Sequence, residues 1–175
     1  GGNAMLDPDV QKLLVEQVNK EFFSAYLYLS IANYYSDKNL NGFENWFHVQ
    51  AQEERDHAML FRTYLIDQGE FVTMGAIAEP KNSFSSFGEP LNDSLEHERF
   101  VTASINNIYS VAAEHKDYRT LQFLDWFIRE QGEEEKNADD LIKKFALYGG
   151  DAKSLYMLNA ELATRTYVPA TLAAN

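Results

Sequence analysis

Carboxylate, imidazole and amide side chains interrupt four stripes of apolar residues in this sequence. Within each stripe the apolar residues are spaced alternately four and three apart, which is the pattern of one buried helix face. The interrupting residues are Glu21, Glu54, His57, Glu98, Gln131 and Glu134. Burial of an unpaired carboxylate costs several kcal/mol, so four carboxylates on buried faces need a common explanation. Binding of metal cations is the chemistry that these groups share.

The spacing of these residues indicates a repeated helical hairpin. Glu21 and Glu54 are 33 residues apart, and Glu98 and Gln131 are separated by the same interval of 33. On the second helix of each hairpin another candidate ligand follows three residues later, on the same helix face. Counted from the expected turn of each hairpin at 1.5 Å per residue, all of these side chains lie at about one depth. The sequence therefore predicts that they meet at a single internal site.

The types of ligand favour iron at this site. Glu54 and His57 can bind one ion, and bridging by Glu54 would hold a second ion a few ångströms away. Carboxylates with a single imidazole favour iron or manganese over zinc in Cys and His sites, and over magnesium, which rarely takes His. The second pair, Gln131 and Glu134, lacks an imidazole, which predicts one tight and one weak metal position. Weak binding suits a site that oxidises iron and then releases it.

The stripes lie on stretches expected to form long helices. Each expected helix, and a short fifth one, begins with a capping residue: Asp7, Asn41, Ser86, Asp117 and Asp151. The first helix is expected to end near residue 37, the second at Gly69, the fourth before Gly149 and the fifth near Thr166. Residues 70 to about 86 contain Gly, Pro and a Ser-rich patch, so they are expected to form a long crossover loop.

These elements predict an all-α fold with one domain. Helices of about 30 residues are roughly 45 Å long, and four of them with one long crossover form an up-down-down-up four-helix bundle. The length of 175 residues is that of about one domain. We expect residues 1–4 to be an expression scar, residues 5–166 to form the bundle with its short fifth helix, and residues 167–175 to be a tail.

Composition narrows the class of partner. The chain has 15 Lys and Arg against 27 Asp and Glu, a net charge of −12, which repels nucleic-acid phosphates and attracts cations. It has no Cys, which excludes disulfides, zinc ribbons and Cys-ligated iron–sulfur clusters. No apolar run is long enough for a membrane span and no signal peptide is recognisable, so we expect a cytoplasmic protein without nucleic-acid or membrane partners.

Four stretches of the sequence resemble the ferritins, in particular the bacterial non-haem ferritins. They are NKEFFSAYLYL (19–29), AQEERDHAMLF (51–61), LEHERF (95–100) and FLDWFIREQGEEEK (123–136). The resemblance extends from about Leu6 to Leu162, and its motifs are specific only in combination. It implies the ferritin-like form of the four-helix bundle. It also implies a cage of about 24 subunits, in which Fe(II) is oxidised by dioxygen or hydrogen peroxide and ferric mineral is stored.

The resemblance implies a diiron ferroxidase centre within the subunit. Its first iron would be bound by Glu21, Glu54 and His57. Glu54 would bridge to a second iron held by Glu98, with Gln131 nearby.

The resemblance further implies a third iron site and two aromatic neighbours. Glu53, Glu130 and Glu134 match the third iron site of bacterial ferritins, although Glu53 and Glu130 are also compatible with a solvated acidic face. Tyr28 matches the tyrosine beside the diiron centre, with a redox or hydrogen-bonding role, and Trp126 matches the nearby tryptophan.

The sequence differs from two families related to the bacterial non-haem ferritins. Bacterioferritins carry a haem-ligating Met between the Glu and His of the second helix, where this chain has Arg55 and Asp56, so no haem is expected. They also repeat the Glu-x-x-His pair on the fourth helix, where this chain has Gln131 and Glu134. Rubrerythrins add a four-Cys iron domain, which the absence of Cys excludes.

Two other functions are compatible with the bundle. A non-storage diiron-carboxylate oxidase or peroxidase would use the same site without a cage, and the size of the particle distinguishes it from a storage protein. A purely structural bundle would pair its buried carboxylates with Lys or Arg, yet no Lys or Arg lies on the four stripes.

Overall fold

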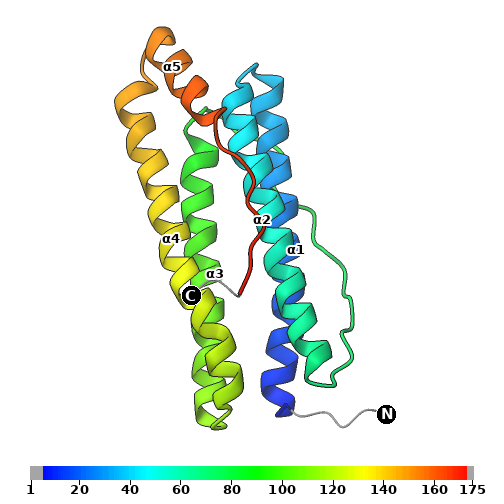
Figure 1. Ribbon diagram of the computed structural model, residues 1–175. Helices are drawn as coiled ribbons and strands as arrows, with labels where there is room; N and C mark the ends of the chain where they lie inside the picture. Colours follow the sequence, from blue (N-terminus) through cyan, green and yellow to red (C-terminus); the bar gives the residue numbers. More distant parts are fainter. Residues whose placement is uncertain (1–5, 173–175) are drawn as a thin grey trace.

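The computed structural model describes residues 6–172 as five α-helices without a β-strand. They are α1 (Pro8–Asp37), α2 (Asn41–Asp67), α3 (Glu89–Glu114), α4 (Tyr118–Tyr148) and α5 (Ala152–Leu162). The predicted all-α bundle with a short fifth helix is confirmed (Figure 1). The expected expression scar at residues 1–4 lies outside the described residues. Within residues 6–172, no helix has the length and apolarity needed to cross a membrane.

The helices are arranged as two hairpins joined by a long crossover. Helices α1 and α2 form one hairpin, α3 and α4 form the other, and the extended segment between α2 and α3 follows the length of the first hairpin (Figure 1). Helix α5 lies across the end of the bundle at which α4 finishes. This topology brings the midpoints of all four long helices to one level, as the spacing of the candidate ligands requires.

The apolar core is divided into two clusters, one toward each end of the bundle. One contains residues from the first half of α1 and the second half of α2, including Leu14 and Phe61. The other contains residues from the opposite halves of these helices together with α5, including Tyr35 and Phe47. Buried polar residues occupy the layer between the clusters, and Glu21 and Glu54 are among them. Helix packing at both ends therefore positions the polar layer in the middle.

Three of the five expected capping residues act as predicted. The side chain of Asp7 accepts a hydrogen bond from the N–H of residue 9, Asp117 from that of residue 120 and Asp151 from that of residue 154. Each of these bonds satisfies a backbone donor that the first turn of a helix leaves without an intrahelical partner.

The expected cap of the second helix is wrong by one residue. The helix begins at Asn41 itself, and its N-cap Leu40 supplies no side-chain hydrogen bond. The N–H groups of Gly42 and Phe43 instead donate to Oδ1 of Asn159 in α5, at 2.7 and 3.2 Å. A residue more than 100 positions away in the sequence thus replaces the local cap, because α5 packs directly on this helix end.

Three other expected boundaries also shift. Helix α2 ends at Asp67, and Gly69 adopts the left-handed backbone (φ 76°) that follows many helix ends. Helix α3 begins at Glu89, three residues after Ser86, although Ser86 Oγ does accept a hydrogen bond from the N–H of Glu89 at 3.2 Å. Helix α5 ends at Leu162 rather than near residue 166.

Candidate metal-binding site

The residues predicted to bind metal lie together in the polar layer between the two apolar clusters. Helix α1 contributes one of them, α2 two, α3 one and α4 two: Glu21, Glu54, His57, Glu98, Gln131 and Glu134. Each is at most 5% exposed. Because burial of so many polar groups is costly, they must be paired with one another or with a ligand.

The half of the site nearest α1 contains Glu21, Glu54 and His57. One ligand atom from each lies within 4.8 Å of the other two. Nδ1 of His57 is 3.2 Å from Oε2 of Glu54 and 3.8 Å from Oε2 of Glu21. Gln17 donates to Oε1 of Glu21 at 3.1 Å, which leaves Oε2 of Glu21 without a hydrogen bond. Among the described residues it is the only such buried side-chain atom, and a cation bound here would supply its partner.

The other half of the site contains Glu54, Glu98 and Glu134, again with one oxygen from each within 4.8 Å of the others. Glu54 therefore belongs to both halves, which is the arrangement that a bridging carboxylate needs. The amide Nε2 of Gln50 donates to Glu54 Oε1 at 3.0 Å and to Glu134 Oε2 at 2.6 Å. Gln50 thus ties these two carboxylates together from the side of α2.

Gln131 faces the same half as a hydrogen-bond donor. Its Nε2 donates to Oε2 of Glu98 at 3.1 Å and to Oγ1 of Thr102 at 3.2 Å. The oxygens that approach Glu98 come from Glu54 and Glu134. The structure therefore brings Glu134 closer to the second ion position than the resemblance to ferritins implied, and it gives Gln131 an orienting contact with Glu98.

The residues expected at a third iron site are only partly assembled. His57, Glu130 and Glu134 have ligand atoms within 4.8 Å of one another. Glu53 is outside every such group in the described chain, and its carboxylate forms an ion pair with Arg165 at 3.0 Å. Arg165 is absent from the residues predicted for the site, because it follows the last helix and lies outside the periodic apolar spacing.

Burial and mutual repulsion control protonation of the site. Burial, reinforced by the charge of Glu54, raises the pKa of Glu21 well above its usual value and that of Glu98 to about 8. Burial and the charge of Glu98 likewise raise the pKa of Glu134. Burial opposes ionisation of Glu54 and His57, but their attraction prevails, so it lowers the pKa of Glu54 and raises that of His57. Without metal, burial therefore favours the neutral form of three of the four carboxylates.

The two aromatic residues singled out beside the site are in contact with it. The hydroxyl of Tyr28 donates a short hydrogen bond to Oε1 of Glu98. Burial and the charge of Glu98 raise the pKa of Tyr28, which keeps its hydroxyl protonated as a donor. The ring of Trp126 lies edge-on to that of His57, with centroids 5.5 Å apart.

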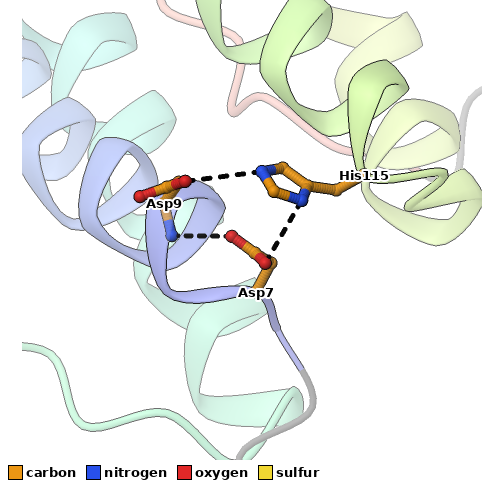
Figure 2. A group of neighbouring side chains, drawn as sticks. All are labelled: Asp7, Asp9 and His115. Atoms are coloured by element: carbon orange, nitrogen blue, oxygen red, sulfur yellow. Dashed lines mark hydrogen bonds and ion pairs between the residues drawn. The ribbon is translucent and has the colours of Figure 1, made fainter.

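A separate group of metal-ligand types joins the start of α1 to the end of α3. Figure 2 shows that His115 lies between Asp7 and Asp9. Its Nδ1 is 3.2 Å from Asp7 and its Nε2 is 3.4 Å from Asp9. Both carboxylates are at least partly exposed, and each has a ring nitrogen facing it. These contacts between the ring and the two carboxylates account for the group without a metal ion.

Comparisons with known proteins agree with this geometry. A family model described as a ferritin-like domain matches residues 11–148. A bacterial non-heme ferritin from Staphylococcus aureus is 38% identical over 163 residues, which cover 93% of this chain and 98% of the relative. One from Staphylococcus epidermidis is 39% identical over the same length and coverage. An open-pore ferritin from the archaeon Archaeoglobus fulgidus is 38% identical with a TM-score of 0.91, covering 93% of this chain and 99% of that structure.

Proposed function

The chain belongs to the ferritin family, and from this premise we propose that it stores and detoxifies iron. Fe(II) is oxidised to Fe(III) at a two-ion centre within each subunit, and the ferric product is deposited in a hollow assembly of identical subunits. The observation that carries the proposal is the pair of buried ligand groups that share Glu54. The unsatisfied Oε2 of Glu21 in one of these groups adds support, because a bound cation would complete it.

Each protein group has a distinct part in this proposal. Glu21 and His57 hold one Fe(II), Glu98 and Glu134 hold the other, and Glu54 contacts both. Each Fe(II) gives up one electron. Dioxygen accepts the two electrons with two protons and leaves as hydrogen peroxide, or hydrogen peroxide accepts them with two protons and leaves as two waters. Hard carboxylate oxygens stabilise Fe(III) more than Fe(II), which favours the transfer.

The carboxylate of Glu98 is oriented from two sides. Tyr28 donates to its Oε1, and Gln131 donates to its Oε2. Such contacts fix the direction in which a carboxylate presents its lone pairs to a metal ion. The proposal therefore gives Tyr28 and Gln131 the role of holding Glu98 in place, with the centre built around the carboxylates and His57.

Assembly into a cage is supported by apolar side chains left exposed in the isolated subunit. Leu147 near the end of α4, Tyr156 and Met157 in α5, and Phe71 in the crossover are each at least 65% exposed. Exposed apolar groups of this size are typical of protein–protein contacts. In the proposed assembly they pack against symmetry-related copies, with about 24 subunits in a closed shell.

Oxidation kinetics test the proposed centre. Fe(II) is added aerobically to wild type, to Glu54→Ala combined with His57→Ala, and to Glu133→Ala, which removes an exposed carboxylate from the same region. We expect the double variant to lose at least about tenfold in initial rate of Fe(III) formation, because it removes the bridging carboxylate and the imidazole. The control is expected to match wild type. Equal rates for all three proteins would show that the centre lies elsewhere.

A further inference from the structure

The segment after α5, residues 163–172, is held against α2, and we refer to it as the C-terminal strap. It runs from the end of α5 back along the bundle (Figure 1). Near its start, the side-chain amide of Asn45 donates to the carbonyl of Arg165 at 3.0 Å. Farther along, the hydroxyl of Tyr167 donates to the carboxylate of Asp56. These two contacts lie on either side of residues 53 and 54 of α2, so the strap passes over the level of the metal site.

Arg165 is the residue of the strap that reaches toward this site. Its guanidinium stacks on the ring of Trp46 at 4.2 Å and donates to the carbonyl of Trp46 at 2.9 Å. Its Nη2 donates to Oε1 of Gln50 at 2.9 Å and to Oε2 of Glu53 at 3.0 Å. The side chain is only 15% exposed, so these contacts fix it in one orientation.

Through Gln50, Arg165 acts on the metal site itself. Because Oε1 of Gln50 accepts from Arg165, the Nε2 end of the amide faces Glu54 and Glu134. The opposite orientation would place an amide oxygen against two carboxylates. Trp46 and Gln50 also line a small cavity, about 20 Å³, that borders Glu134. The strap is therefore in direct contact with the wall of the site.

Through Glu53, Arg165 competes with a cation. Glu130 and Glu134 already lie within 4.8 Å of each other with His57, and Glu53 is the neighbouring carboxylate that is missing from the group. Its oxygen is engaged by the guanidinium. The positive charge of the guanidinium, 3.0 Å from Oε2 of Glu53, also repels a divalent ion that approaches this carboxylate. A third ion that binds Oε2 of Glu53 must therefore displace Arg165 from this oxygen.

We propose that the C-terminal strap regulates the third ion position of the site. With the strap docked, Arg165 holds Glu53 and the third ion binds only weakly. With Arg165 displaced, Glu53 joins Glu130 and Glu134 in binding the third ion. This inference rests on the proposed function, because it takes the two-ion centre as given, and it assigns to Arg165 a positioning role outside that centre.

Anaerobic Fe(II) titration by calorimetry tests the proposal on the assembled protein. The variants are Arg165→Gln and a matched control, Lys144→Gln, which breaks an exposed ion pair with Glu161 and leaves Glu53 untouched. We expect the third ion to bind about tenfold more tightly to Arg165→Gln, since a competing positive charge is removed. Lys144→Gln is expected to bind the third ion as wild type does.

Two further variants distinguish the proposed role of Arg165 from a merely structural effect of its substitution. In Arg165→Gln combined with Glu53→Gln the gain in third-ion affinity should vanish, because the released ligand is absent. A chain ending at Thr164 replaces Arg165→Gln if that variant fails to assemble, and it should show the same gain. An unchanged third-ion affinity in the folded variants overturns the role of Arg165 and leaves the two-ion centre intact. Absence of Fe(II) binding at the two-ion centre of wild type instead overturns the proposed function.

Discussion

At the scale of single residues, the site combines groups that would be unfavourable without a cation. The unsatisfied Oε2 of Glu21 and the raised pKa values of Glu98 and Glu134 have the same cause, which is burial among other carboxylates. Residues of this kind lower stability in order to create a binding site. Substitutions here should therefore affect metal binding more than folding.

Glu21→Gln separates these two effects. Burial raises the pKa of Glu21 in the metal-free protein and so favours its neutral acid, and glutamine has nearly the same shape as that acid. We expect the metal-free variant to melt within a few degrees of wild type, a difference on the order of 1 kcal/mol or less. The rise in melting temperature on adding Fe(II) anaerobically should be largely lost, because a ligand oxygen is replaced by an amide. Scanning calorimetry with and without Fe(II) measures the melting temperature of the metal-free variant and its rise when the ion binds. An undiminished rise would remove Glu21 from the ligand set.

Metal affinity should increase with pH. The pKa of Glu98 is raised from its usual 4.5 to about 8, so between these values the metal-free folded protein retains a proton that an ion must displace. Affinity for Fe(II) should rise through this window and level off above about pH 8. In the same window the folded state binds more protons than the unfolded chain, so the contribution of Glu98 to the free energy of unfolding falls as pH rises.

Titration calorimetry in buffers of different ionisation enthalpy measures the protons released per ion. We expect wild type to release protons when it binds Fe(II) near neutral pH, and Glu98→Gln to release fewer protons. Proton uptake on binding, or an affinity that does not depend on pH, would contradict the protonation state assigned to this carboxyl group.

At the scale of helices, local sequence patterns were sufficient to predict most of the secondary structure. Apolar spacing predicted the four long helices, and a capping residue predicted the short fifth one. The carboxylates of Asp7, Asp117 and Asp151 predicted the starts of three helices. The start of α2 was wrong because its backbone donors are satisfied by Asn159, a contact set by tertiary packing. The strap was also beyond prediction, because an extended segment has no helical period and its partners lie more than 100 residues away.

Substitution of Gly42 tests the contact between α2 and α5. A Cβ atom on Gly42 would lie 1.7 Å from the backbone oxygen of Asn159, so Gly42→Ala must push α5 away from α2. The displaced helix would leave the first N–H groups of α2 without Asn159, at a cost of about 1–2 kcal/mol for the lost cap alone.

The control is Gly132→Ala, because a Cβ at Gly132 of α4 would meet no atom within 4 Å. Alanine favours a helix interior over glycine by roughly 0.5–1 kcal/mol, so this variant should unfold at a slightly higher temperature than wild type. Thermal unfolding of both variants compares them directly. A Gly42→Ala protein as stable as wild type would indicate that α5 does not pack on α2 as described.

At the scale of the whole molecule, helix geometry explains which parts of the site were predictable. Because each residue advances a helix by a fixed 1.5 Å, sequence spacing alone placed Glu21, Glu54 and Glu98 at one depth. Spacing cannot specify which way a side chain turns. The spacing therefore could not predict that Glu134 approaches Glu54, or that Gln50 forms hydrogen bonds with both carboxylates. Those contacts depend on the angle between α2 and α4.

The size of the particle is the remaining prediction, and it distinguishes storage from a non-storage diiron oxidase or peroxidase. We expect light scattering to give several hundred kDa for wild type, as a closed shell of about 24 subunits requires. Tyr156→Glu combined with Met157→Glu places two charges on the exposed face of α5. Burial of these charges between copies would cost several kcal/mol, so the variant should form smaller particles. Its subunits should still oxidise Fe(II), because the two-ion centre lies within one chain, but they should fail to retain ferric mineral. A wild-type monomer or dimer would favour the non-storage enzyme.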